Sequence, residues 1–142
     1  MSTELVTRYV RADMTAYNGF TWPESGPVSC PDWDPAPKCG KGLHGWLHGR
    51  GDAKAWDHYD GDLMLVVEVD AASIVDLNGK VKFPAGAVVY CGDAAGMSAV
   101  MAAAGYTSGL INGTAIAGDY GTATAGDYGT ATAGYGGTAT AG

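Results

Sequence analysis

The side chains best able to do chemistry lie within the first 91 residues of the chain. His44, His48 and His58, with Cys30 and Cys39, are residue types that bind zinc. However, the spacing Cys39-x4-His44-x3-His48 matches no standard set of zinc ligands. We therefore expect no metal site, and we interpret these residues as loop histidines and buried thiols.

Cys91 is the best candidate for a nucleophile. It follows an apolar strand and precedes Gly92, Asp93 and an expected helix start, where a thiolate would be stabilised. Cysteine is also common as a small buried apolar residue, which is the interpretation we favour. The glycines from Gly40 to Gly51 do not form a phosphate-binding loop, because no GxxxxGK[ST] motif is present. We expect no enzymatic activity and no cofactor.

The apolar pattern predicts an α+β head that is mostly antiparallel sheet with a C-terminal helix. The Asn78-Gly79 pair predicts a hairpin between two of its strands. We predict strands at Glu4–Val10, Leu63–Asp70, Ser73–Leu77, Lys80–Phe83 and Ala87–Cys91, helices at Asp52–Tyr59 and Asp93–Ala104, and a loop over Cys30–Gly51.

Charge and composition exclude several classes of partner. The chain has 142 residues and a net charge of −7, which argues against binding to nucleic acid or anionic membrane. No apolar run is long enough to span a bilayer. The first residues lack the basic start and apolar core of a signal peptide, and three cysteines make no disulfide framework, so we expect a cytoplasmic protein. Release or surface exposure by another route is left open.

A change in composition near residue 105 divides the chain. All eight Lys and Arg residues precede it, whereas Asp119 and Asp127 are the only charged residues after Gly109. We therefore predict a head at 1–104 that caps the rest, a connector at 105–112 and a repeat tail at 113–142.

The tail repeats with a period of eight, in units that begin at Gly113, Gly121, Gly129 and Gly137. Thr alternates with Ala, which favours short strands, and Gly permits the corners. Two units make one sixteen-residue coil, so we expect a β-solenoid with a thin Ala and Gly interior. A disordered tail is the alternative that the Gly, Ala and Thr composition allows.

The segment AGDYGTATAGDYGTATAGYGGTATAG resembles the repeats of bacterial ice-nucleation proteins. That family folds as a β-solenoid with T-x-T rows, a tyrosine ladder and a tendency to multimerise. The resemblance places the tyrosine ladder on Tyr120, Tyr128 and Tyr135. It places the T-x-T motif on Thr122, Thr124, Thr130, Thr132, Thr138 and Thr140. This chain departs from the pattern of that family in two ways. It has only a small number of coils, and its first unit has the sequence Thr114-Ala115-Ile116 in place of T-x-T.

The head has resemblances of its own. ADMTAYNGFTWPE, CGKGLHGW and VVEVD are similar to an uncharacterised domain of actinobacteria and their phages, which often precedes short tandem repeats. GKGLHGW, AKAWDHY and LVVEVD also resemble ADP-ribosyltransferase-like domains, in which a later acid is catalytic. Glu68 and Asp70 are the nearest acids here, and neither lies in a matching motif.

These features predict a structural protein that associates with copies of itself. The repeat pattern runs to Gly142 without a polar cap, so we expect an open strand edge that joins chains into multimers or filaments. Two alternatives remain: a repeat that organises ice or water, and a ligand-binding or ADP-ribosyltransferase-like head with the repeat as a spacer.

Overall fold

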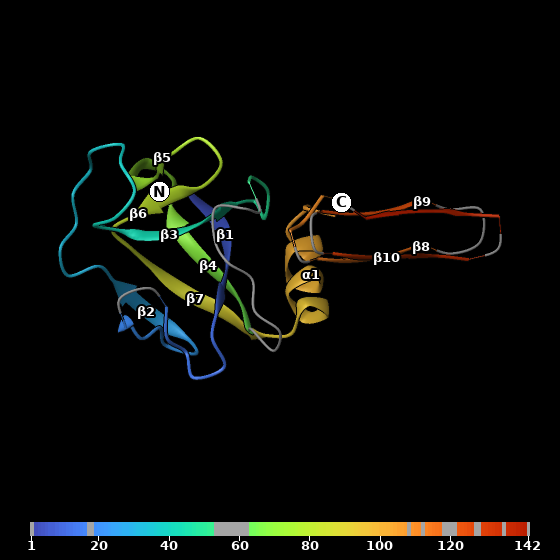
Figure 1. Ribbon diagram of the computed structural model, residues 1–142, viewed down its shortest axis with the longest axis horizontal. Helices are drawn as coiled ribbons and strands as arrows, with labels where there is room; N and C mark the ends of the chain where they lie inside the picture. The colour runs from blue at the N-terminus through green and yellow to red at the C-terminus, as the bar shows by residue number, and fades with distance from the viewer. Residues whose placement is uncertain are drawn as a thin grey trace.

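An antiparallel sheet forms the head of the protein, and a narrow pair of parallel sheets extends from it as a tail (Figure 1). The structure is a computed structural model that describes residues 2–16, 19–52, 63–107, 109–111, 113–117, 122–126, 129–134 and 136–141. The strand order in the head is β2-β7-β4-β1-β3-β6-β5. The strands of the head are β1 (Thr3–Val10), β2 (Gly26–Ser29), β3 (Leu43–Leu47), β4 (Leu63–Asp70), β5 (Val75–Asp76), β6 (Val81–Phe83) and β7 (Ala85–Gly92).

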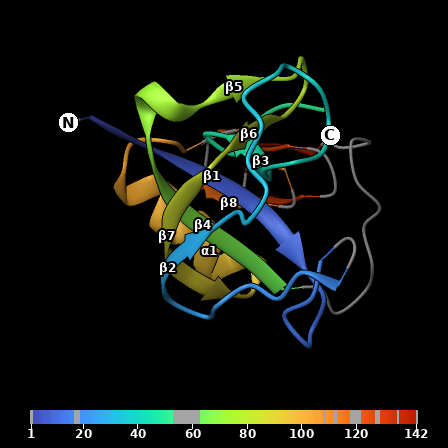
Figure 2. The ribbon, with the colours of Figure 1, turned by 90° about the vertical axis from the view of Figure 1, so that its left-hand side faces the viewer.

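The central strands β1 and β4 are buried on both faces over most of their length. Alternate residues of a strand point to opposite sides, so β4 sends Leu65 and Val67 to one side and Met64 and Val66 to the other, all fully buried. Two separate cores result, one on each face of the sheet. Figure 2 shows β1, β4 and β7 side by side, with α1 (Ala94–Ala103) behind them. A sheet covered on both faces explains why LMLVVEVD reads as one apolar run.

Helix α1 covers the core that contains Met64 and Val66, which we call the tail-side core. Asp93 caps the helix by accepting a hydrogen bond from the backbone N–H of Gly96 at 2.8 Å. Gly105 ends it with a φ of +99°. Met97 and Met101 are fully buried against the sheet. The C-terminal helix of the head is confirmed, with the cap and the terminating glycine that the sequence predicts.

Most of the predicted strands are confirmed. Leu63–Asp70 agrees in both bounds, and β5 and β6 form the predicted hairpin. Leu77 N–H donates to the carbonyl of Lys80 at 2.9 Å across Asn78 and Gly79, which have φ values of +61° and +118°. Positive φ at both positions is the reason why an Asn-Gly pair suits this turn. The helix predicted at Asp52–Tyr59 lies almost wholly outside the described residues.

The loop predicted over Cys30–Gly51 is wrong in its second half, because β3 (Leu43–Leu47) lies there and pairs with both β1 and β6. The cause is Gly45, which breaks the alternation expected of a strand. A Cβ at this position would overlap the side chain of Val6 and lie 2.9 Å from the backbone oxygen of Thr7. Glycine therefore allows β3 to approach β1, although it suggests a loop in the sequence.

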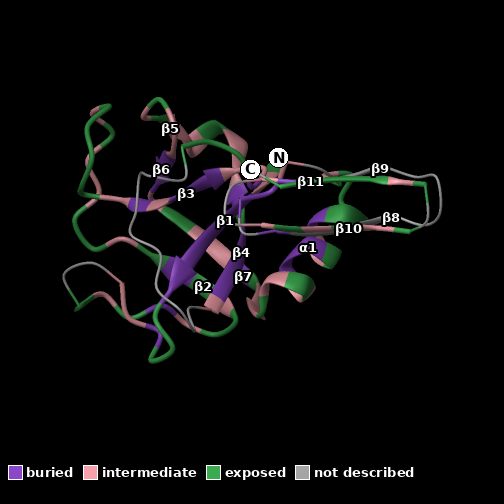
Figure 3. Ribbon diagram, turned by 45° about the vertical axis from the view of Figure 1, so that its right-hand side comes forward, coloured by how far each residue is buried: buried purple, intermediate pink, exposed green. Residues whose placement is uncertain are grey.

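The tail comprises β8 (Thr114–Ala117), β9 (Thr122–Ala125), β10 (Thr130–Ala133) and β11 (Thr138–Ala141). Leu110 and Ile111, just before β8, are 4% and 2% exposed and belong to the tail-side core, together with Trp46 and Met101. Ile111 N–H donates to the carbonyl of Gly49 at 2.8 Å. The segment 109–111 therefore joins the core of the head, and Figure 3 shows exposed and intermediate residues along β10 and β11.

Replacement of Leu110 by Ala should lower the free energy of unfolding by about 2–4 kcal/mol, because it leaves a cavity in a closed core. Urea denaturation followed by circular dichroism measures this loss. Val89→Ala is the control, since Val89 is 50% exposed and its truncation should cost less than about 1 kcal/mol. Equal effects of the two substitutions would show that Leu110 does not join the tail to the core of the head.

Candidate functional site

The four tail strands pair two by two with a fixed register. β8 pairs in parallel with β10, and β9 pairs in parallel with β11. Thr130 lies opposite Thr114, and Thr138 lies opposite Thr122, so each strand pairs with the strand sixteen residues away. The two sheets contact each other, since β9 contacts both β8 and β10. Thus every second octad returns to the same sheet (Figure 1).

The predicted threonines lie on these strands at matched positions. Thr140 is opposite Thr124, and Thr132 is opposite Ile116, which is the imperfection expected in the first unit. The backbone of Thr122 pairs with that of Thr138, and the side chain of Thr122 is not among the parts that the structure describes. The exposed threonines are Thr124, Thr130, Thr132, Thr138 and Thr140.

Some alanines and glycines of the tail are closely packed, whereas the alanines of β11 are exposed. Ala125 is 5% exposed, and Ala131 and Ala133 are half-buried between exposed threonines. A Cβ on Gly129 would lie 2.6 Å from the backbone oxygen of Gly113 and 2.7 Å from Cβ of Ala125. The corner at this glycine therefore has no room for any side chain.

The predicted tyrosine ladder cannot be placed. Tyr120, Tyr128 and Tyr135 lie outside the described residues, so their positions stay a prediction.

The candidate metal ligands have separate partners in the structure. Cys39 Sγ accepts from Lys80 Nζ at 3.3 Å, and His48 Nε2 lies 2.6 Å from a carboxylate oxygen of Glu4. His48 also stacks on Tyr106, with 4.5 Å between the ring centroids. His58 lies outside the described residues. Among the residues that are described, no three His, Cys, Asp or Glu side chains are grouped to hold a metal ion.

The two partly buried cysteines have raised pKa values. Burial raises the pKa of Cys91, whose sulfur lies 3.8 Å from the sulfur of Met14. Burial also raises the pKa of Cys30, which donates to Asp32 at 3.1 Å. A raised pKa disfavours the thiolate that nucleophilic attack needs.

The acids considered for an ADP-ribosyltransferase-like site lie on β4. Glu68 is exposed, and Asp70 accepts from Ala72 N–H at 3.1 Å at the start of the 3-10 helix Ala71–Ser73. The head contains a cavity of about 450 Å³ that is lined in part by His44, and neither acid lines it. The geometry thus gives Asp70 a capping role and brings no acid of β4 to that histidine.

These features define a small mixed head, mostly antiparallel sheet, joined to a repeat tail of parallel strand pairs. The chain belongs to the family described as a domain of unknown function, DUF7666, whose model matches residues 5–103 and so ends with α1. Three ice nucleation proteins from Pseudomonas syringae, one of them from pathovar syringae, are each 35% identical to it over 91 residues. That alignment covers 63% of this chain and 8% of each relative. No solved structure matches the chain.

The resemblance to ice nucleation proteins is therefore supported by sequence comparison, and the head remains a domain without an assigned activity. None of the helices in the described ranges has the length and apolar character needed to cross a bilayer.

His44 should make stability depend on pH. Burial, with the nearby charges of Lys80, Arg8 and Lys82, lowers its pKa from 6.5 to about 4. Its Nε2 also accepts a hydrogen bond from Gly40 N–H at 3.2 Å, which only an unprotonated nitrogen can do. Between pH 6.5 and 4 the unfolded chain binds a proton that the folded chain does not, so stability falls as the pH falls through this window.

We expect the proton uptake of His44 to lower the free energy of unfolding by about 2 kcal/mol as the pH falls from 6.5 to 4, with allowance for the partial exposure of the side chain. His44→Gln keeps an acceptor for Gly40 and removes the titration, so its stability should fall less steeply between pH 6.5 and 4. Urea denaturation at several pH values compares the two proteins. Identical pH slopes, or an NMR titration of His44 with a pKa near 6.5, would contradict the expectation.

Proposed function

We propose that this protein is a structural, self-associating repeat protein, in which the head caps a short β-solenoid. The observation that supports this most is the in-register parallel pairing of strands sixteen residues apart. A solenoid with two strands per coil has this pairing, since successive coils stack about 4.8 Å apart in the hydrogen-bonding direction. The likeness to ice nucleation proteins supports the same assignment.

The head acts as the cap at one end of the stack. Gly126 N–H donates to the carbonyl of Leu110 at 2.9 Å, and Leu110 is itself buried in the tail-side core. The segment 109–111 is therefore the first layer on which the tail strands rest. Short repeats that bury little need such support, because a few coils are not stable alone.

The other end of the stack is the proposed association surface. Strands β10 and β11 are hydrogen-bonded to β8 and β9 on one side, and no strand among the described residues pairs with their other side. Residues 128–142 contain no charge and no proline, the two features that usually block an exposed edge. The edge can thus receive a further coil, and we propose that a second copy of the chain supplies it.

This arrangement favours dimers over filaments. A filament requires two different free surfaces on each chain, whereas the head occupies one end of this stack. Two copies that meet through the same edge satisfy each other and leave no edge for a third. The thin Ala and Gly interior buries little apolar surface, so backbone hydrogen bonds must supply most of the stabilisation.

Charges placed on the far edge should prevent this association. Thr138→Lys with Thr140→Lys adds two positive charges to β11, and like charges that meet across the edge repel each other. The double variant should be monomeric at protein concentrations where the unmodified chain is dimeric, with a larger difference at low salt. Light scattering coupled to size-exclusion chromatography measures the mass.

The matched control adds the same two charges elsewhere. Ala102→Lys with Ala103→Lys lies on the exposed end of α1, so it should leave the dimer intact. A 142-residue chain that stays monomeric at high concentration would refute self-association. Growth well beyond a dimer would refute the argument from a single open edge.

A second candidate function is the organisation of water or ice by the threonine rows. The observation that favours it is the exposure of Thr124, Thr130, Thr132, Thr138 and Thr140, with Thr140 paired to Thr124 in register. Hydroxyls repeated along and across parallel strands form a regular grid of hydrogen-bonding groups. The ice nucleation proteins that share 35% identity with the chain give this candidate its second support.

Removal of the hydroxyls tests this candidate. Thr130, Thr132, Thr138 and Thr140 replaced together by Val keep the branched shape and strand propensity but lose the hydrogen-bonding groups. If the rows act on ice, the unmodified chain slows or reshapes growing ice crystals under the microscope and the variant does not. Crystals that grow alike with the chain and with buffer would exclude ice binding by this chain.

A further inference from the structure

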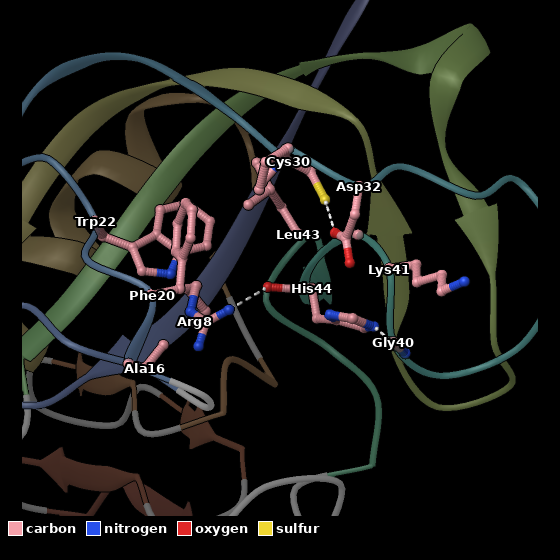
Figure 4. A pocket seen from close by; sticks show the side chains of 13 residues that line it. Arg8, Ala16, Phe20, Trp22, Cys30, Asp32, Gly40, Lys41, Leu43 and His44 are labelled. Atoms are coloured by element: carbon pink, nitrogen blue, oxygen red, sulfur yellow. Dashed lines mark hydrogen bonds between the residues drawn. The ribbon is translucent and has the colours of Figure 1, made fainter.

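A cavity of about 450 Å³ opens in the head, on the sheet face away from α1 and the tail. Its described walls come from β1, from Ala16 and residues 19–22, from the loop 30–42 and from the start of β3. Figure 4 shows Arg8, Phe20 and Trp22 on one side of it, with Asp32 and His44 across from them. A volume of this size is typical of sites for small molecules.

One wall of the cavity is apolar. Phe20 packs edge-on against Trp22, with 5.7 Å between the ring centroids, and Trp22 is 2% exposed. Ala16, Pro31 and Leu43 are further apolar residues of the lining. Such a wall accepts an aromatic or branched hydrocarbon body, because contact with it removes apolar surface from water.

The polar part of the cavity is built around a buried arginine. Arg8 is 9% exposed, and two hydrogen bonds hold its guanidinium in place, from Nε to the carbonyl of Tyr9 and from Nη1 to the carbonyl of His44. The guanidinium also lies 4.7 Å from the centre of the Trp22 ring. The charge is therefore fixed at the boundary between the polar and apolar walls.

Further cations surround this position although the whole chain carries a net charge of −7. Lys41 lines the cavity, and Lys82 is 1% exposed with its Nζ 3.2 Å from the carbonyl of Gly40. The lowered pKa of His44, caused by burial and then by Lys80, Arg8 and Lys82, reports the same positive surroundings. Asp32 is the one carboxylate among the lining residues described, and it accepts from Cys30.

We infer that this cavity binds a small organic anion with an apolar body, such as an aromatic carboxylate. The body packs against Phe20 and Leu43, the anionic group lies near Arg8, and Lys41 adds a more distant positive charge from the opposite side of the cavity. Charge-assisted contacts to a fixed guanidinium select the anion, because a neutral molecule of the same shape gains only the apolar contact. The site is independent of the tail and would persist if the tail did not associate.

Two fluorescent probes with one hydrocarbon body test the inference. 8-Anilinonaphthalene-1-sulfonate carries an anionic group, and N-phenyl-1-naphthylamine lacks it. We expect saturable one-to-one binding of the sulfonate, at least about tenfold tighter than that of the neutral probe and weaker at high salt. Chemical shift changes should map to residues 16–44, and the NMR pKa of His44 should rise when the sulfonate is bound.

Variants of the lining residues locate the site. Lys41→Gln should weaken sulfonate binding about threefold, whereas Lys38→Gln, which removes a charge from the same loop outside the cavity, should change it less than twofold. Arg8→Met should weaken it about tenfold, and circular dichroism must show that this variant is folded. If Arg8→Met does not fold, the comparison of Lys41 with Lys38 and the shift map decide. Equal affinity for both probes, equal effects of the two lysine variants, or shifts that map to the tail would overturn the inference.

Discussion

The burial of Leu110 and Ile111 in the head is the interaction on which the rest of the structure depends. These side chains complete the core beneath α1, and the backbone of the same segment supports the tail strands. One short segment thus supplies apolar contacts to the head and hydrogen-bonding groups to the tail. The octads themselves are mostly threonine, alanine and glycine, with few larger side chains to bury. Main-chain hydrogen bonds join the tail to this segment and its strands to one another.

The two faces of the head sheet have different neighbours, which separates two possible roles. The face beneath α1 is closed by Met97, Met101 and Leu110, so it serves stability and attachment. The opposite face is covered by loops, and there the cavity lies between Arg8 and His44. A ligand on that face and a partner on the far edge of the tail would not compete for the same surface. Binding and association are thus open to separate measurement in one chain.

How far the sequence predicts this structure depends on how local each signal is. The strand Leu63–Asp70, the hairpin at Asn78-Gly79 and the helix cap at Asp93 were predictable, because neighbouring residues decide each of them. Strand β3 was missed because the reason for Gly45 lies on β1, about forty residues earlier in the sequence. The predicted threonine positions fit the observed register, whereas the attachment role of Leu110 and Ile111 depends on a fold that had to be known first. The cavity was hidden for the same reason, since its walls are drawn from separate parts of the chain.

Because strands sixteen residues apart pair with each other, the position of an octad in the sequence decides which of the two sheets it joins. Because the first layer is held in place at Leu110, consecutive octads must alternate between the two sheets. Loss of one octad would transfer every later strand to the opposite sheet, and the two faces of the tail would exchange their threonines. Loss of two octads would shorten both sheets equally and leave each face with the same kind of row. Copy number in such a repeat is thus not a simple measure of length, since odd and even changes produce differently balanced surfaces.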